Sequence, residues 1–343
     1  MDGTVPRSAF LAGISAIGAQ LAAGGAAAAQ TSRRVDVHIH HGSPGWISGM
    51  PPGEVTPSVA SLKDWPATRM LEEMDRAGTQ LGFLSLTAPG IWFGDPSQSR
   101  KLARDANEFF ARMVADNPKR FGFFAALPLP DVEGSLQAIA YGLDTLKADG
   151  VEVFTSSGGK YLGDPLFDPV FQELNRRKAV VFVHPPSVRC CLNLVPGVAD
   201  TVIEAQTDTT RAIAGMIFSG ASRRFPDIRM IFVHAGGTMA SVNERLALLA
   251  KTPKYQPVLP NGFLAEAARF YYDTATTSNA VTMAAIRKLV PVSNLVFGTD
   301  FPFRGIADQA QALSASGVFS VAELDAVNRG NAAGLLPRVR SSA

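Results

Sequence analysis

The sequence predicts an α/β fold of the (β/α)8 or TIM-barrel type, and three observations support this. First, short apolar runs rich in β-branched residues alternate with amphipathic stretches from about residue 33 onward, a pattern typical of a parallel sheet covered by helices. Second, the apolar runs number eight, and 343 residues exceed the roughly 250 that such a barrel needs. Third, four histidines and one aspartate stand where apolar runs end, which is where such barrels carry their active sites.

The predicted strands and helices follow in chain order. The eight strands are expected at Arg34–His40, Gln80–Thr87, Phe121–Leu129, Gly150–Ser156, Ala179–Pro185, Arg229–Gly236, Phe270–Thr277 and Asn294–Pro302. The helices are expected at Ala67–Ala77, Arg100–Asp116, Val132–Lys147, Pro165–Arg177, Thr209–Arg223, Thr238–Leu249, Ala280–Lys288 and Ile306–Ser314. Asp131 and Asp164 are expected to begin helices, and Gly150 and Gly220 to end them. A last helix over Val321–Leu336 would close the barrel.

Two long insertions interrupt this alternation. Gly42–Lys63 is rich in Pro, Gly and Ser and follows the first strand, and Ser187–Thr209 follows the fifth. We expect both to be loops at the mouth of the barrel, where loops set substrate choice. The second contains Cys190 and Cys191, the only cysteines. Adjacent cysteines offer neither a disulfide framework nor metal-ligand spacing, so we expect packing residues, with a strained vicinal disulfide as the less favoured alternative.

The composition excludes several classes of protein. A hydrophobic fraction of 46% and a charged fraction of 18% are typical of a well-buried globular protein rather than a disordered chain. A net charge of +2 offers no basic field for nucleic acid. The chain also lacks a run of basic residues that would bind an anionic membrane surface.

The first 30 residues form a separate segment. Arg7 precedes an apolar stretch over Ala9–Ala29, which ends in small residues suited to signal cleavage. Pro6 stands where a twin-arginine signal would have its first arginine. We expect residues 1–30 to be an export signal, or otherwise a low-complexity extension or a mis-assigned start, before a single catalytic domain over 31–343. Glycines dilute the stretch, so a lasting membrane anchor is not expected. A working signal implies a periplasmic or secreted protein; without one, the protein is cytoplasmic.

The histidines and the aspartate suggest a metal site. His38 and His40 lie two residues apart on one strand, so their side chains share a face. His184 ends the fifth strand and Asp300 ends the eighth. Any one of them could be structural, as a core histidine or a helix cap. Their joint placement at one rim predicts three imidazoles and a carboxylate around one divalent ion, with a position left open for water or substrate.

Two further histidines remain. His234 ends the sixth strand and precedes Ala235-Gly236-Gly237, and an imidazole beside a metal can donate and accept protons. The alternative roles for His234 are a fifth ligand or a side chain that orients a ligand. His41 is expected to be structural or to support the ligands.

These motifs resemble a known family. His38-x-His40, His184, His234-Ala235-Gly236-Gly237 and Gly298-Thr299-Asp300-Phe301-Pro302 occur in the order and spacing of the amidohydrolase superfamily. They are most similar to its decarboxylase branch, which includes aminocarboxymuconate semialdehyde decarboxylase and γ-resorcylate decarboxylase. The resemblance covers nearly all of Val35–Leu336.

The resemblance implies a barrel of the metal-dependent hydrolase type with one zinc, or sometimes manganese. The ion would be held by His38, His40, His184 and Asp300, while His234 would handle protons. Arg245 matches a family arginine that often reaches a neighbouring subunit's substrate, which implies a homodimer; otherwise Arg245 is a surface residue. Four segments look most like 6-methylsalicylate decarboxylases: Ser85–Gly90, Leu127–Pro130, Lys160–Pro165 and Asp208–Arg211.

Departures from the family pattern limit the expected number of metal ions and the expected class of substrate. Val151–Ser157 has no lysine that could bridge two metals, which favours one ion. Gly42–Lys63 has no arginine for a second substrate carboxylate, so a monocarboxylate with an apolar or phenolic body is expected. Trp92 and Phe93 could form an aromatic wall for its ring, or belong to the core.

The expected function is therefore the non-oxidative decarboxylation of a small aromatic or unsaturated carboxylic acid. Asp300 or His234 would deliver the proton, and Arg245 would balance the carboxylate charge. One alternative is metal-dependent hydrolysis of a lactone, ester or amide. Another is a barrel that only binds a small acid.

Overall fold

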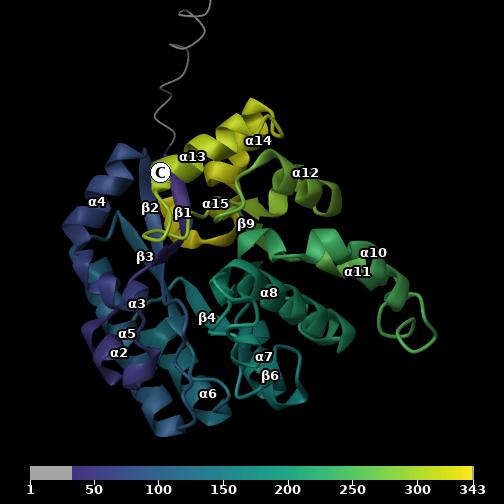
Figure 1. The fold of residues 1–343 in the computed structure, drawn as a ribbon, viewed down its shortest axis with the longest axis horizontal. Helices are drawn as coiled ribbons and strands as arrows, with labels where there is room; N and C mark the ends of the chain where they lie inside the picture. Colours follow the sequence, from purple (N-terminus) through teal and green to yellow (C-terminus); the bar gives the residue numbers. More distant parts are fainter. Residues whose placement is uncertain (1–32, 342–343) are drawn as a thin grey trace, which may run out of the picture. The chain divides into compact units, whose positions relative to one another are not determined.

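The computed structural model describes residues 33–341, and within them eight parallel strands form one sheet in the order β1-β2-β3-β4-β7-β8-β9-β10. The two edge strands meet, because Val37 N donates to Phe297 O at 3.0 Å and Asp300 N donates to His38 O at 3.0 Å. An isolated bridge joins Ile39 to Phe301. Helices surround these strands on the outside of the sheet (Figure 1). The predicted (β/α)8 barrel is therefore confirmed.

All eight predicted strands exist, but most end earlier than expected. Their bounds are β1 Arg34–His40, β2 Thr79–Ser85, β3 Phe121–Ala126, β4 Gly150–Phe154, β7 Val180–His184, β8 Arg229–Phe232, β9 Tyr271–Asp273 and β10 Leu295–Val296. The predictions ran on because apolar residues continue past the last paired residue into the loops of the rim. A short antiparallel hairpin, β5 Ser156–Ser157 and β6 Lys160–Tyr161, was not predicted.

The helices largely follow the predicted amphipathic stretches. Their bounds are α4 Ala67–Arg76, α5 Pro96–Asp116, α6 Val132–Ala140, α7 Asp168–Arg176, α8 Asp200–Phe218, α9 Ala221–Arg224, α10 Met239–Ala250, α11 Gly262–Ala267, α12 Ala280–Leu289, α13 Ile306–Ala315, α14 Val321–Asp325, α15 Asn331–Leu335 and α16 Pro337–Ser341. Asp131 caps α6, Asp164 caps the turn before α7, and Gly220 separates α8 from α9 with φ +76°. Gly150 was wrongly predicted to end a helix, since it opens β4.

Both insertions were predicted as loops, and both contain helix. The first forms α2 Pro44–Gly49 and α3 Pro57–Ser61, each with proline in its first turn and a capping hydroxyl, from Ser43 or Thr56. Proline suits a helix start because the first N–H groups need no helical partner. In the second insertion, α8 begins at Asp200, so only its first half is loop.

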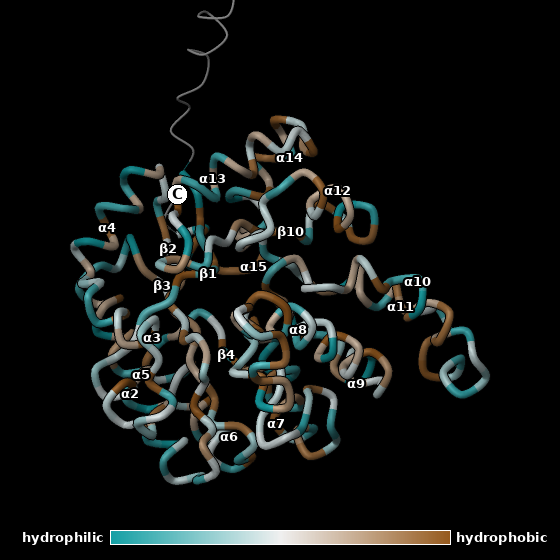
Figure 2. Tube along the Cα trace, viewed as in Figure 1, coloured by the Kyte–Doolittle hydropathy of each residue, from teal (hydrophilic) through white to brown (hydrophobic). Residues whose placement is uncertain are grey.

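The C-terminal helices close the interior of the barrel. Leu335, Leu336 and Val339 pack in one cluster with strand residues that include Phe124 and Phe182. In Figure 2 the outer helices alternate between hydrophilic and hydrophobic residues, as expected for helices with one face on a core. The C-terminal helices therefore share one hydrophobic cluster with the strands of the barrel.

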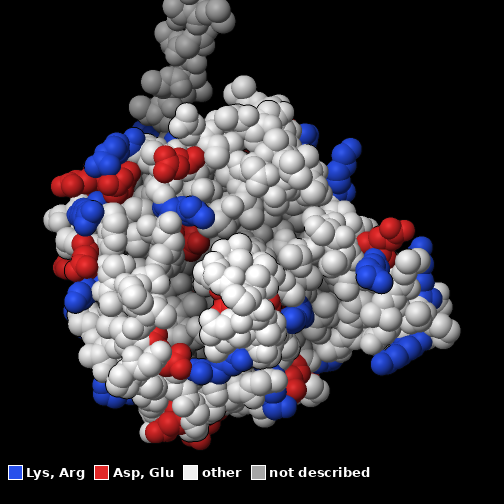
Figure 3. Space-filling model, in the orientation of Figure 1, with Lys and Arg blue, Asp and Glu red and all other residues white. Residues whose placement is uncertain are grey.

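On the face that Figure 3 shows, neither acidic nor basic side chains gather into a patch of one sign. In Figure 3 acidic and basic side chains are interspersed around the visible face. Among residues 33–341, no helix is long and apolar enough to cross a membrane. The predicted export signal, residues 1–30, lies outside the described residues and stays a prediction.

Candidate metal centre and active site

The structure brings together the four predicted metal ligands. His38 Nε2 and His40 Nε2 lie 2.9 Å apart. Asp300 Oδ1 lies 3.1 Å from His40 Nε2 and 3.4 Å from His38 Nε2. The rings of His184 and His40 are 4.6 Å apart between centroids. One ligand atom from each of the four residues falls within 4.8 Å of the others.

In each of the three histidines, a contact of Nδ1 outside the cluster decides which ring nitrogen faces the cluster. His38 Nδ1 lies 2.7 Å from Asp273 Oδ2, and His40 Nδ1 lies 3.2 Å from Ser85 Oγ. His184 Nδ1 lies 2.9 Å from the carbonyl oxygen of Pro185. If each Nδ1 carries the proton and donates it, the Nε2 lone pairs face one another and the Asp300 carboxylate. Such an arrangement is repulsive unless a cation lies between them, and it is the usual one for metal-binding histidines. The residues present therefore fit a divalent metal ion.

For His40, His184 and Asp300, the surroundings favour the charge states that metal ligands need. Burial lowers the pKa of His40 and lowers that of His184 well below its usual value, which keeps both imidazoles neutral. Burial acts to raise the pKa of Asp300, but hydrogen bonds from His38 and His40 outweigh it and hold that pKa well below its usual value. Neutral imidazoles and an ionised carboxylate are the forms that bind a metal.

Asp273 is a functional residue that the sequence analysis missed. It is fully buried at the end of β9, and its Oδ1 accepts hydrogen bonds from His234 N at 2.8 Å and Ala275 N at 3.0 Å. Because its Oδ2 contacts His38, this carboxylate joins the ligand strand β1 to the segment that holds His234. The signal was available, since Asp273 stands within the seventh predicted strand.

A second buried aspartate supports the same strand ends. Asp36 Oδ1 accepts from His38 N at 3.0 Å, and its Oδ2 accepts from Thr299 Oγ1 at 2.6 Å. These bonds tie the two ends of the sheet next to the ligands. Burial raises the pKa of Asp36 to about 7, partly offset by the hydrogen bond from Thr299.

His234 lies beside the cluster in a backbone conformation that few residues adopt. Its φ is +56° and that of Ala235 is +54°, and such left-handed residues are enriched at functional sites. His234 Nδ1 lies 3.1 Å from the carbonyl oxygen of Ala275 and 3.1 Å from Thr276 Oγ1. Its ring is 5.2 Å from that of His38. With Nδ1 engaged, Nε2 is available to exchange a proton with a bound molecule.

His41 is structural. Its Nδ1 lies 3.1 Å from the Gly42 carbonyl oxygen and its Nε2 lies 2.8 Å from that of Trp65. Burial lowers the pKa of His41, so the neutral ring donates from one of these two nitrogens, and this bond helps to hold the first insertion in place.

A cavity of about 620 Å³ lies among the loops that follow β2, β4 and β7, and its lining shares no residue with the metal cluster. Both predicted aromatic residues, Trp92 and Phe93, line it, and Phe93 also packs against the core. Phe154 lines it as well, and its ring centroid lies 6.4 Å from that of His184, so one aromatic side chain borders both the cavity and the cluster. The rest of the lining comes mainly from the two insertions and the loops after β2 and β4: Pro51, Glu54, Pro89, Gly90, Ile91, Gly94, Ser156, Ser157, Gly158, Gly159, Tyr161, Pro186, Ser187, Val188, Arg189 and Cys190.

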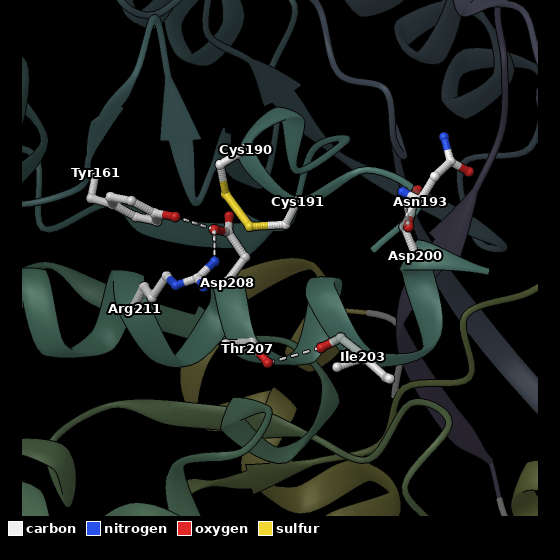
Figure 4. The surroundings of a disulfide bond; sticks show 9 residues. All are labelled: Tyr161, Cys190, Cys191, Asn193, Asp200, Ile203, Thr207, Asp208 and Arg211. Atoms are coloured by element: carbon white, nitrogen blue, oxygen red, sulfur yellow. Dashed lines mark hydrogen bonds and ion pairs between the residues drawn. A yellow bond between two sulfur atoms is a disulfide. The ribbon is translucent and has the colours of Figure 1, made fainter. Parts of the chain in front are cut away.

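The expectation for the cysteines was wrong. Cys190 and Cys191 form a disulfide, and neither is buried in the core. The reason is that they stand in a short turn, Arg189–Cys191, that runs over the protein surface after Pro185-Pro186. Figure 4 shows this disulfide, with Asp208 of α8 and its donor Tyr161 in the same region.

Arg245 does not join the site of its own chain. It is exposed on α10 and does not line the cavity. Its predicted contact with substrate therefore requires a second subunit and stays a prediction.

Comparison with known proteins shows which family the chain belongs to. The sequence profile of the amidohydrolase family matches residues 35–338. Decarboxylase yanB from Aspergillus niger is 34% identical over 90% of this chain and 89% of its own length. The 6-methylsalicylic acid decarboxylase of Penicillium expansum is 33% identical over 78% of this chain and 85% of its own.

A solved structure shows the same fold. The dihydroxybenzoic acid decarboxylase of Polaromonas, crystallised with manganese and the inhibitor 2-nitroresorcinol, superposes with a TM-score of 0.75 at 23% identity. The match covers 88% of this chain and 96% of that one. The profile match and the relatives at about one-third identity place the chain: it belongs to the amidohydrolase family and is a carboxy-lyase of that family.

Proposed function

We propose that this protein is a metal-dependent, non-oxidative decarboxylase of a small aromatic monocarboxylate similar to 6-methylsalicylate. The observation that carries the proposal is the convergence of the His38, His40 and His184 Nε2 atoms and the Asp300 carboxylate, next to His234 and an aromatic-lined cavity. Its relatives favour decarboxylation over the hydrolysis of a lactone, ester or amide.

The cofactor we propose is one divalent metal ion held by His38, His40, His184 and Asp300. Three imidazoles and one carboxylate suit zinc, and manganese, found in the Polaromonas structure, is the alternative. When bound, the ion supplies a positive charge that can hold a carboxylate and a neighbouring phenolic oxygen.

The chain's own residues then supply the proton and the binding surface. Decarboxylation breaks the bond between ring and carboxylate, and the electron pair of that bond forms a new C–H bond on the ring. His234 Nε2 is the donor we favour, because its Nδ1 is held by Ala275 and Thr276. Asp300, the other donor expected from the sequence, is less suited to this role because its pKa is held well below the usual value. Trp92, Phe93 and Phe154 would pack against the ring and exclude water.

We also propose a homodimer. Arg245 and two large apolar side chains of the same helix, Leu248 and Leu249, are exposed on α10, the latter two by 57% and 42%. A second copy that covered this helix would bury them and could bring Arg245 to the partner's substrate. Analytical ultracentrifugation of the wild type and of Leu248→Glu tests this: a dimer that dissociates in the variant supports it, and a wild-type monomer refutes it.

For residues 1–30 we propose an export signal. Periplasmic fractions from cells that express the full chain should contain a protein shortened at its N-terminus. A full-length protein confined to the cytoplasm would contradict this.

The decisive experiment combines metal content with CO2 release from hydroxybenzoates in one preparation. About one zinc or manganese per chain, with CO2 from 6-methylsalicylate, is the expected result. Metal without CO2 from any member of the panel would refute decarboxylation of this substrate class. A protein that contains no metal after purification, and still binds none after incubation with zinc or manganese, would refute the site itself.

A further inference from the structure

We propose that the Cys190–Cys191 disulfide is a specificity-determining part of the substrate cavity, which contacts the ring substituent of the acid rather than its carboxylate. The inference rests on the proposed function and names the residues that would distinguish one aromatic acid from another. Nothing in the metal cluster uses either cysteine.

The first support is the position of the disulfide. Cys190 lines the same cavity as Trp92, Phe93 and Phe154, and it is an exposed residue. Cys190 thus places a sulfur-bearing residue in the same cavity wall as these aromatic side chains. Sulfur packs favourably against aromatic rings and alkyl groups, with about 0.3–1.5 kcal/mol for contacts of methionine sulfur with a ring.

The second support is how firmly the turn is held. Cys191 N donates to Val188 O at 3.0 Å at the start of the turn. Arg189 Nη2 donates to Glu54 Oε1 at 2.8 Å, which ties the turn to the other insertion across the cavity lining. After the turn, Asn193 N donates to Asp200 Oδ1 at 2.8 Å (Figure 4). The backbone is therefore fixed on both sides, and the disulfide decides where the two sulfur atoms lie.

The third support is the size of the cavity. A cavity of about 150 Å³ holds a benzene ring, whereas this one measures about 620 Å³. A substrate whose carboxylate binds at the metal cluster leaves room around its ring. A substituent on the ring would extend toward the other lining residues, and those from the second insertion include Cys190.

Reduction offers a way to change this surface without replacing any residue. A phosphine attacks one sulfur, the S–S bond breaks, and both sulfurs end as protonated thiols. Water supplies the oxygen of the phosphine oxide that forms. Since the chain has only two cysteines, the reagent acts on one bond. The bond closes a ring between adjacent residues, so the entropy that it removes from the unfolded chain is small and the fold should survive.

The test compares oxidised protein, phosphine-reduced protein and the Cys190→Ala/Cys191→Ala variant. Val195→Ala is the matched control, because Val195 is 46% exposed in the same loop and does not line the cavity. For each form, kcat and KM are measured with salicylate and with 6-methylsalicylate, together with Tm and metal content.

The expected result is selective. KM for 6-methylsalicylate should rise about twofold to tenfold on reduction and in the double variant, as the loss of a sulfur contact predicts. KM for salicylate, both kcat values, Tm and metal content should stay as in the oxidised protein, as should every value for Val195→Ala. Equal KM values in all forms would overturn the proposal, and so would an equal change for both acids or a loss of metal.

Binding measurements separate this proposal from the proposed function. If no hydroxybenzoate releases CO2, calorimetric Kd values of the same two acids are compared between oxidised and reduced metal-loaded protein. A Kd that changes for 6-methylsalicylate alone supports the role of the disulfide although the reaction is refuted. Equal Kd values, or no binding to either form, overturn it.

Discussion

His38 Nδ1 lies 2.7 Å from Asp273 Oδ2, and both side chains are completely buried. Burial acts to lower the pKa of His38, yet Asp273 and then Asp300 raise it to about 10. The same contact orients the ring so that Nε2 faces His40 and Asp300. One carboxylate thus sets both the direction and the basicity of a metal-binding imidazole, as supporting carboxylates commonly do.

We therefore predict that Asp273→Asn weakens metal binding. The amide can donate a hydrogen to Nδ1, which would leave the proton on Nε2 and remove its lone pair. Loss of such a supporting group typically costs about tenfold to hundredfold in metal affinity. Competition with a chromophoric chelator measures this, and the exposed Asp325→Asn is the control. Unchanged affinity would mean that Asp273 only stabilises the fold.

Asp300→Asn should abolish turnover while the protein stays folded. Asp300 lies within 3.4 Å of His38 Nε2 and 3.1 Å of His40 Nε2, and its side chain is 15% exposed. An amide keeps the shape but loses the negative charge that the cluster requires. Loss of kcat with an unchanged circular dichroism spectrum is expected. Substantial residual activity would remove Asp300 from the mechanism.

His234→Asn should separate proton transfer from metal binding. Asparagine tolerates the left-handed backbone at this position, where φ is +56°. Because His234 is not one of the four clustered ligands, metal content should remain that of the wild type. We expect kcat to fall by about 10²–10⁴, the usual value of general acid–base catalysis. If the metal is lost with the activity, His234 is a ligand instead.

The buried carboxyl group of Glu152 on β4 should lower the free energy of unfolding as pH rises, because ionisation of this group is unfavourable in the folded state. Its side chain is fully buried, Oε2 accepts from Leu86 N at 2.8 Å, and Oε1 has no hydrogen-bond partner. Burial raises the pKa of Glu152 from 4.5 to about 8. Between these values the unfolded chain releases the proton while the folded chain keeps it, so stability is full below about pH 4.5 and declines toward pH 8.

Glu152→Gln should flatten that dependence. Free energies of unfolding from urea titrations at pH 5 to 8.5 should fall less steeply with pH in the variant than in the wild type. The difference between the two proteins isolates this carboxyl from other titrating groups. Parallel profiles would show that Glu152 is ionised in the folded protein.

The order of strands and the four clustered ligands could be predicted from the sequence because both depend on local pattern. Continuous apolar runs specify strands buried on both faces, and parallel strands of a barrel end at one rim. His38, His40, His184 and Asp300 stand at such ends, so their meeting follows from the barrel alone. Proline-led helices within the insertions were missed, since their composition is also that of loops.

Only the tertiary structure decided which residues hydrogen-bond to the Nδ1 atoms of the histidines and which residues line the cavity. Asp273 reaches His38 because closure of the barrel brings β9 beside β10 and β10 beside β1, across 235 positions of the chain. The cavity, with Cys190 and Glu54 in its lining, is formed by two insertions that no local pattern relates to each other. The place of Arg245 is a further example, since its position in the motif does not reveal that it is exposed on α10. Local sequence encodes the period and the ends of each element, whereas contacts between distant segments exist only once the sheet has closed.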